Sequence, residues 1–138
     1  MSLQKKAFPG QLDAVRDACD FVTGIVRDAG MGDDVIFHCE ISVEEIFTNI
    51  VQYGYAKNGA NKSVEIVVEQ MPDYLQIVII DEAPRFNPLQ LNDPDPKTPL
   101  GDRPEGGWGV FFVKKFMDEV RYRYEKQRNH LILIKNKH

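Results

Sequence analysis

Residues 63–80 read SVEIVVEQMPDYLQIVII, and this stretch decides the fold. Ser63–Glu69 is rich in valine and isoleucine and predicts a strand, residues 71–73 predict a turn, and Tyr74–Ile80 predicts the partner strand. A turn this short joins antiparallel strands, because parallel strands need a long crossover connection. The sequence therefore predicts an antiparallel sheet in the middle of the chain.

Two amphipathic helices are predicted before this hairpin. Apolar side chains recur three and four residues apart over residues 13–30 and again over residues 33–54. Gly30 stands where a glycine commonly follows the end of a helix. Residues 1–8 alternate weakly between polar and apolar side chains and predict an edge strand.

The sequence after the hairpin begins with a stretch that shows no periodicity, at about residues 83–105. It holds six prolines, and an irregular segment of that length in a compact domain is typical of a lid or binding loop. A short helix with Val110–Met117 follows. Two more strands are predicted, at residues 120–124 and 131–135, joined through residues 126–129.

The predicted order of elements is thus β-α-α-β-β-lid-α-β-β. This order favours an α+β fold: a two-layer sandwich with a mostly antiparallel mixed sheet and helices on one face. A chain of 138 residues has the size of one domain, so we expect a single domain over residues 1–138.

Composition excludes several functional classes. The 17 basic and 21 acidic side chains give a net charge of −4, which disfavours nucleic acid or an anionic membrane as a partner. Two cysteines are too few for a disulfide framework, and the three histidines are too scattered for a metal site. The sequence shows no apolar run long enough for a membrane span or a secretory signal, so a cytoplasmic protein is expected.

Three features could carry chemistry, and each also has an ordinary structural explanation. Glu45 and Asn49 lie one turn apart on the second helix, where a solvated polar face is the alternative. Asp81 follows a strand and could accept a hydrogen bond from an exocyclic amine, or cap a turn. Gly106–Gly109 precedes a helix and could bind phosphate through backbone N–H groups, although glycine-rich helix starts are common.

These features occur in one order with the predicted lid between them, and at this point the sequence resembles a family. It is similar to the GHKL (Bergerat-fold) ATPases, and among them to the small anti-sigma-factor serine-protein kinases. The family's motifs match as follows: residues 45–55 (EIFTNIVQYGY) match the N-box, residues 81–88 (DEAPRFNP) the G1 box and residues 106–110 (GGWGV) the G2 box.

This resemblance implies roles for individual residues. Glu45 would be the general base, Asn49 would bind Mg²⁺ and nucleotide, and Asp81 would hold the adenine amino group. The G2 residues would wrap the triphosphate: Gly106, Gly107, Trp108, Gly109 and Val110. The implied cofactors are ATP or ADP with Mg²⁺.

The G1 box departs from the usual family pattern at two positions. Ala83 has a Cβ where the backbone could need a positive φ. Arg85 replaces a small residue, and it would either block close approach of the nucleotide or offer its guanidinium to a phosphate. Glu105, before the G2 glycines, is also less suited to a triphosphate than a basic residue, and Arg103 could compensate for it.

The resemblance favours an ATP-dependent serine/threonine kinase that phosphorylates a STAS-type anti-anti-sigma partner and also sequesters a sigma factor. The alternative is a non-catalytic, nucleotide-gated binding module that exchanges partners, and the altered G1 box keeps it open. Phe8, Phe21 and Val22 are candidates for a homodimer contact, with core packing as their ordinary explanation.

Overall fold

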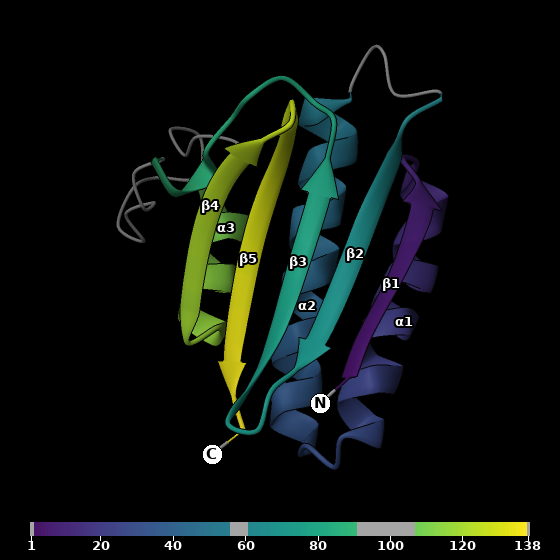
Figure 1. Cartoon of the computed structure of the whole chain (residues 1–138). Coiled ribbons are helices and arrows are strands. Elements are labelled where there is room, and N and C mark those ends of the chain that lie inside the picture. The colour runs from purple at the N-terminus through teal and green to yellow at the C-terminus, as the bar shows by residue number, and fades with distance from the viewer. Residues whose placement is uncertain (1, 56–60, 91–106, 138) are drawn as a thin grey trace.

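The computed structural model describes residues 2–55, 61–90 and 107–137 as one sheet covered by helices (Figure 1). Of the predicted lid, residues 91–105 lie outside the described part, and so does Gly106. The strands are β1 (Ser2–Pro9), β2 (Ser63–Gln70), β3 (Tyr74–Asp81), β4 (Glu119–Glu125) and β5 (Arg128–Asn136). The helices are α1 (Val15–Asp28), α2 (Asp33–Asn49) and α3 (Gly107–Phe116).

The strands form one sheet in the order β1-β2-β3-β5-β4. All four pairings are antiparallel, so the part of the sheet that the structure describes contains no parallel pair. The three helices lie on the same side of this sheet (Figure 1). The predicted two-layer α+β architecture is therefore confirmed, with a sheet that is antiparallel throughout.

The core lies between the sheet and the helices. Alternate side chains of the central hairpin face the helices and are almost completely buried: Val64, Ile66 and Val68 from β2, and Leu75, Ile77 and Ile79 from β3. Phe47 of α2 is fully buried against them. Burying a side chain of this size contributes about 1.5–3 kcal/mol, so the hairpin holds the two layers together.

Phe8, Phe21 and Val22 belong to this core. Phe8 is 3% exposed and Val22 is fully buried, and the ring of Phe21 lies edge-on to the ring of Phe8 at 5.8 Å. The expectation that these side chains form an exposed self-association patch is wrong, because Phe8 of β1 packs against Phe21 of α1 and Val22 is buried in the core.

A turn of different helical geometry follows directly after helix α2. The regular α-helix stops at Asn49, and Ile50–Gly54 continues as one wider turn of π-helix. Tyr55 follows and is buried. The single helix predicted to Gly54 thus consists of two parts, and the irregular part lies beside the end of β3 that carries Asp81. Short π segments inside helices often occur at functional sites.

The last hairpin is tighter than the sequence suggested. Lys126 and Gln127 alone connect β4 to β5, and both have positive φ values, 54° and 61°. Two such residues form the hairpin turn whose twist matches that of the strands. Consequently Asn129 is the second residue of β5, opposite Asp81, and does not lie in the connection where the sequence analysis placed it.

Candidate functional site

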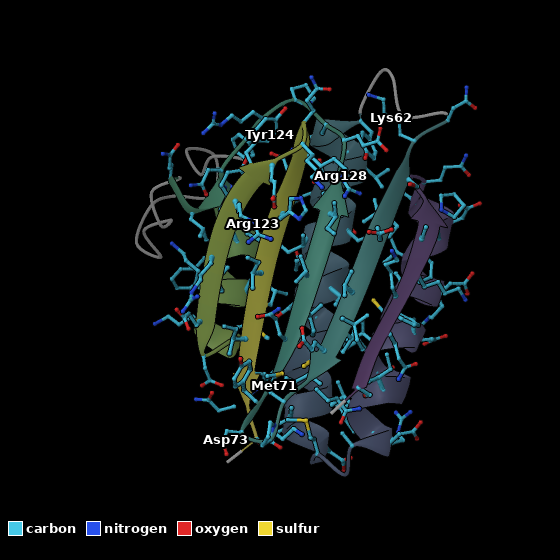
Figure 2. All side chains as sticks on the ribbon, in the orientation of Figure 1. Lys62, Met71, Asp73, Arg123, Tyr124 and Arg128 are labelled. Atoms are coloured by element: carbon cyan, nitrogen blue, oxygen red, sulfur yellow. The ribbon has the colours of Figure 1, made fainter. Side chains whose placement is uncertain are left out.

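A pocket of about 530 Å³ opens at the end of β3 between the sheet and helices α2 and α3. In Figure 2 this end of the sheet is marked by Lys62, Tyr124 and Arg128, and the opposite end by Met71 and Asp73. Four predicted site residues line the pocket: Asn49, Asp81, Arg85 and Val110. Side chains from the N-box, G1 and G2 stretches therefore meet around one cavity.

Helix α2 directs Glu45 and Asn49 toward α3. Both side chains are partly buried, while the neighbouring Glu44 is exposed. Burial, together with the Glu44 carboxylate, raises the pKa of Glu45. A carboxylate with a raised pKa accepts a proton more readily than a carboxylate with an ordinary pKa.

Gly109 brings helix α3 directly against these two residues. A Cβ built on Gly109 would lie 2.6 Å from Glu45 Oε2 and 3.4 Å from Asn49 Nδ2. Only glycine leaves room for the Glu45 carboxylate at this distance. The G2 glycine thus has a packing reason for its presence, in addition to any contact with a ligand.

The other G2 residues are described in part. Gly107 begins helix α3, which confirms a helix start at the glycine-rich motif, and Trp108 lies in its first turn. Val110 is 4% exposed and lines the pocket. Gly106 lies outside the described residues.

Asp81 is a buried carboxylate at the edge of the pocket, 7% exposed. Its Oδ1 accepts hydrogen bonds from the backbone N–H of Ala83 and from Asn129 Nδ2, both at 2.9 Å. Burial raises the pKa of Asp81, and the two hydrogen bonds oppose that rise. Asp81 is thus a buried carboxylate held at the pocket by two hydrogen-bond donors.

Asn129 holds the whole G1 turn, and the sequence analysis missed it. Its Nδ2 lies within 3.2 Å of Asp81 Oδ1 and the carbonyl oxygens of Ala83 and Pro84. Its Oδ1 accepts hydrogen bonds from the backbone N–H of Phe86, at 3.1 Å, and from the Tyr122 hydroxyl. A polar residue opening the otherwise apolar strand HLILI was the available signal.

Ala83 does not adopt the positive φ that the sequence analysis considered for this position. In the described part of the chain, Lys126 and Gln127 are the only residues other than glycine with positive φ. Ala83 is 6% exposed, and its Cβ packs inward. Its methyl group is therefore accommodated without backbone strain.

The guanidinium of Arg85 lies over the ring of Tyr124, 5.2 Å from its centroid. The side chain is exposed at the edge of the pocket. Guanidinium groups stack favourably on aromatic rings, which accounts for this position. The two alternative roles of Arg85, blocking the nucleotide and contacting a phosphate, both stay predictions.

Tyr55 is a second residue that the sequence analysis did not assign to the site. Its hydroxyl donates to the carbonyl of Ser63 at 2.8 Å and accepts from the N–H of Glu82 at 2.7 Å. Burial raises the pKa of this hydroxyl to about 12. Tyr55 therefore ties the end of the helical segment to the start of β2 and to the residue after Asp81.

The described residues contain no cluster of histidine, cysteine, aspartate and glutamate that could hold a metal ion alone. A hard cation bound at Asn49 would need further oxygen ligands, and nucleotide phosphates are the usual source for Mg²⁺. The donor set fits a metal that arrives with its nucleotide.

No helix among the described residues is long and apolar enough to cross a membrane.

The fold is a single layer of helices over an antiparallel sheet. Its pocket lies between Asn49 of α2, Asp81 at the end of β3 and the start of α3 at Gly107. Together these features are typical of a nucleotide-binding class of domain. The model of the histidine kinase-like ATPase domain matches residues 8–135. The chain belongs to this family.

Proteins similar to this chain include the serine-protein kinases called RsbW. The Bacillus subtilis protein is 33% identical over 104 residues, which cover 72% of this chain and 64% of the relative. The Staphylococcus epidermidis protein is 30% identical over 103 residues, covering 72% and 65%. The chain thus spans somewhat less than two thirds of the length of these relatives.

Among solved structures, the RsbU and RsbW domains of a Mycobacterium tuberculosis protein align with a TM-score of 0.69. The alignment covers 98% of this chain and 32% of that chain, at 12% identity. At this identity the likeness shows the fold alone, and it agrees with the predicted Bergerat-type architecture.

Proposed function

We propose that this chain binds ATP with Mg²⁺ and transfers the γ-phosphoryl group to a serine or threonine of a partner protein. The observation that carries the proposal is the pocket in which Asn49, Asp81 and Val110 meet, with Gly109 placed against Glu45. The similarity to serine-protein kinases supports the same reaction.

Each residue has a role in this proposal. Asp81 accepts a hydrogen bond from the adenine amino group, and the start of α3 offers backbone N–H groups to the phosphates. The side-chain oxygen of Asn49 completes the coordination of Mg²⁺, which neutralises charge on the phosphate oxygens when it is bound.

Glu45 is the proposed general base. The partner's hydroxyl oxygen forms a bond to the γ-phosphorus, the bond between that phosphorus and the β–γ bridging oxygen breaks, and ADP leaves. The hydroxyl proton passes to the Glu45 carboxylate, whose raised pKa suits it to the task.

The proposed partner is a STAS-type anti-anti-sigma protein, and sequestration of a sigma factor is a second proposed activity. From these two proposed partners we infer that the chain acts in the cytoplasm. Residues 1–138 act as one domain in this proposal, with residues 83–105 as the lid.

Self-association is a further proposed property. Since Phe8, Phe21 and Val22 are core residues, we place the contact elsewhere, on the face of the sheet that none of the described helices covers. Val78 and Ile132 pair there and are only partly buried. Sedimentation of the wild type beside Ile132→Glu tests it: a dimer lost in the variant supports this face, and a monomeric wild type removes the homodimer from the proposal.

The decisive experiment follows label from [γ-³²P]ATP to a STAS-domain protein of the same organism in the presence of Mg²⁺. Transfer by the wild type and its loss in Asp81→Asn support the kinase. Calorimetric binding of ADP without transfer supports the nucleotide-gated binding module instead. Absence of ADP binding contradicts both readings.

A further inference from the structure

The hydrogen-bond pattern around Asn129 fixes which of its side-chain atoms donate. The backbone N–H of Phe86 can only donate, so the atom facing it must be Asn129 Oδ1. The carbonyls of Ala83 and Pro84 can only accept, so the atom facing them must be Nδ2. The amide therefore has one orientation, without reference to Asp81.

That orientation determines how Asp81 can act. Nδ2 donates to Asp81 Oδ1, and the N–H of Ala83 donates to the same oxygen. A carboxylate oxygen has two lone pairs, so these two donors saturate Oδ1. In the part of the chain that the structure describes, hydrogen bonds to this carboxylate go to Oδ1 alone, which leaves Oδ2 for a ligand.

A carboxylate with one available oxygen distinguishes purine bases. The exocyclic amine of adenine needs a single acceptor. Guanine offers two adjacent donors, its ring N–H and its exocyclic amine, and the pair is best matched by both oxygens of one carboxylate. Saturation of Oδ1 therefore favours a 6-aminopurine and disfavours guanine.

We propose that Asn129 is a specificity-determining residue: by saturating one oxygen of Asp81, it restricts the carboxylate to reading the base through the other. This inference rests on the proposed nucleotide binding and adds to it the source of base selectivity. Asn129 acts through Asp81 and is a positioning residue, supported in turn by the hydroxyl of Tyr122.

The test compares ADP and GDP by titration calorimetry on the wild type, Asn129→Leu and the control Asn136→Leu. Asn136 lies at the exposed far end of the same strand, so the control makes the same chemical change away from the pocket. Because hydrogen bonds to charged groups are worth enough to change affinity roughly tenfold or more, we expect the ADP-to-GDP affinity ratio to fall about tenfold in Asn129→Leu. The ratio should stay at the wild-type value in the control.

If the role of Asn129 were purely structural, its substitution would lower the affinities for ADP and GDP by the same factor. An unchanged ratio in a folded Asn129→Leu protein therefore overturns the inference, and so does a wild type that binds GDP as tightly as ADP. A wild type that binds neither nucleotide contradicts the proposed function itself, which is a different result. If thermal melting shows Asn129→Leu to be unfolded, Asn129→Ser is measured in its place against the same criterion.

Discussion

Gly54 and Ala83 share a space that holds only one methyl group. A Cβ built on Gly54 would lie 2.9 Å from the Cβ of Ala83, closer than carbon atoms approach one another. The π-helical turn that ends at Gly54 and the G1 turn at Ala83 are thus in direct contact. The alanine at this G1 position is accommodated because its neighbour across the contact is glycine.

This contact predicts a compensating pair of substitutions. Gly54→Ala should destabilise the protein by about 1–3 kcal/mol, since it overpacks a closed contact. Adding Ala83→Gly removes the clashing methyl group and should restore most of that loss. Urea denaturation of the two single variants and the double variant measures the coupling, and additive effects would show that the two residues do not compete for the same space.

Glu45→Gln should separate binding from chemistry. The amide is similar in size to the carboxylate but cannot accept the hydroxyl proton. We expect ADP affinity close to that of the wild type and phosphoryl transfer slower by about 10²–10⁴-fold. Single-turnover transfer from labelled ATP checks the rate, and a rate equal to the wild type would remove Glu45 from the mechanism.

Gly109→Ala should lower activity without lowering stability. The new Cβ displaces the flexible Glu45 carboxylate, at little cost to the fold. Alanine within a helix is favoured over glycine by up to about 1 kcal/mol, so stability should hold or rise. Transfer should fall because the proposed base has moved.

Gly24→Ala in α1 is the matched control for that change. Nothing lies within 4 Å of a Cβ at Gly24, so the same gain in helix preference comes without any displacement. Urea melts and transfer rates of both variants are compared. A Gly109→Ala protein with full activity would show that the position of Glu45 is unimportant.

Tyr55→Phe should loosen the turn after Asp81. It leaves the carbonyl of Ser63 without its donor and the N–H of Glu82 without its acceptor. The expected loss is about 1–3 kcal/mol of stability, with weaker ADP binding. In Tyr74→Phe, at the other end of β3, no hydrogen bond within the described residues is lost, and this variant should behave as the wild type in both thermal melting and calorimetry.

The two cysteines should make the protein sensitive to alkali. Burial raises the pKa of both Cys19 and Cys39 from 9 to about 12, with Glu44 adding to the effect at Cys19. Between those pH values the unfolded chain releases protons that the folded chain retains, so stability falls as pH rises from about 9 to about 12. Urea midpoints across this range should fall less in Cys39→Ala, and native protein should not react with a thiol reagent at pH 8.

Much of the fold could be predicted because its signals are local. The valine-rich hairpin at residues 63–80 and the helical periodicity before it each depend on neighbouring residues, and both are confirmed. The grouping of Asn49, Asp81 and Val110 was inferred from motif order, and the pocket brings them together. The positions of side chains that depend on pairing across the sheet were not accessible in the same way.

Asn129 illustrates that limit. Its role depends on the register that places it opposite Asp81, 48 residues earlier, and on a two-residue turn formed without glycine. The exposure of Phe8 was misjudged for a related reason, since its burial requires helix α1 to fold back over β1. Both features arise from contacts between distant parts of the chain.

The pairing of β3 with β5 also bears on the time at which the protein becomes competent during synthesis. Strand β3 leaves the ribosome well before β5, so Asp81 spends that interval without the neighbour that orients it. A nascent chain that ends before residue 129 contains both strands of the central hairpin, but its Asp81 still lacks the hydrogen bond from Asn129. In the proposed site, nucleotide would therefore meet an oriented Asp81 carboxylate only after β5 has paired with β3.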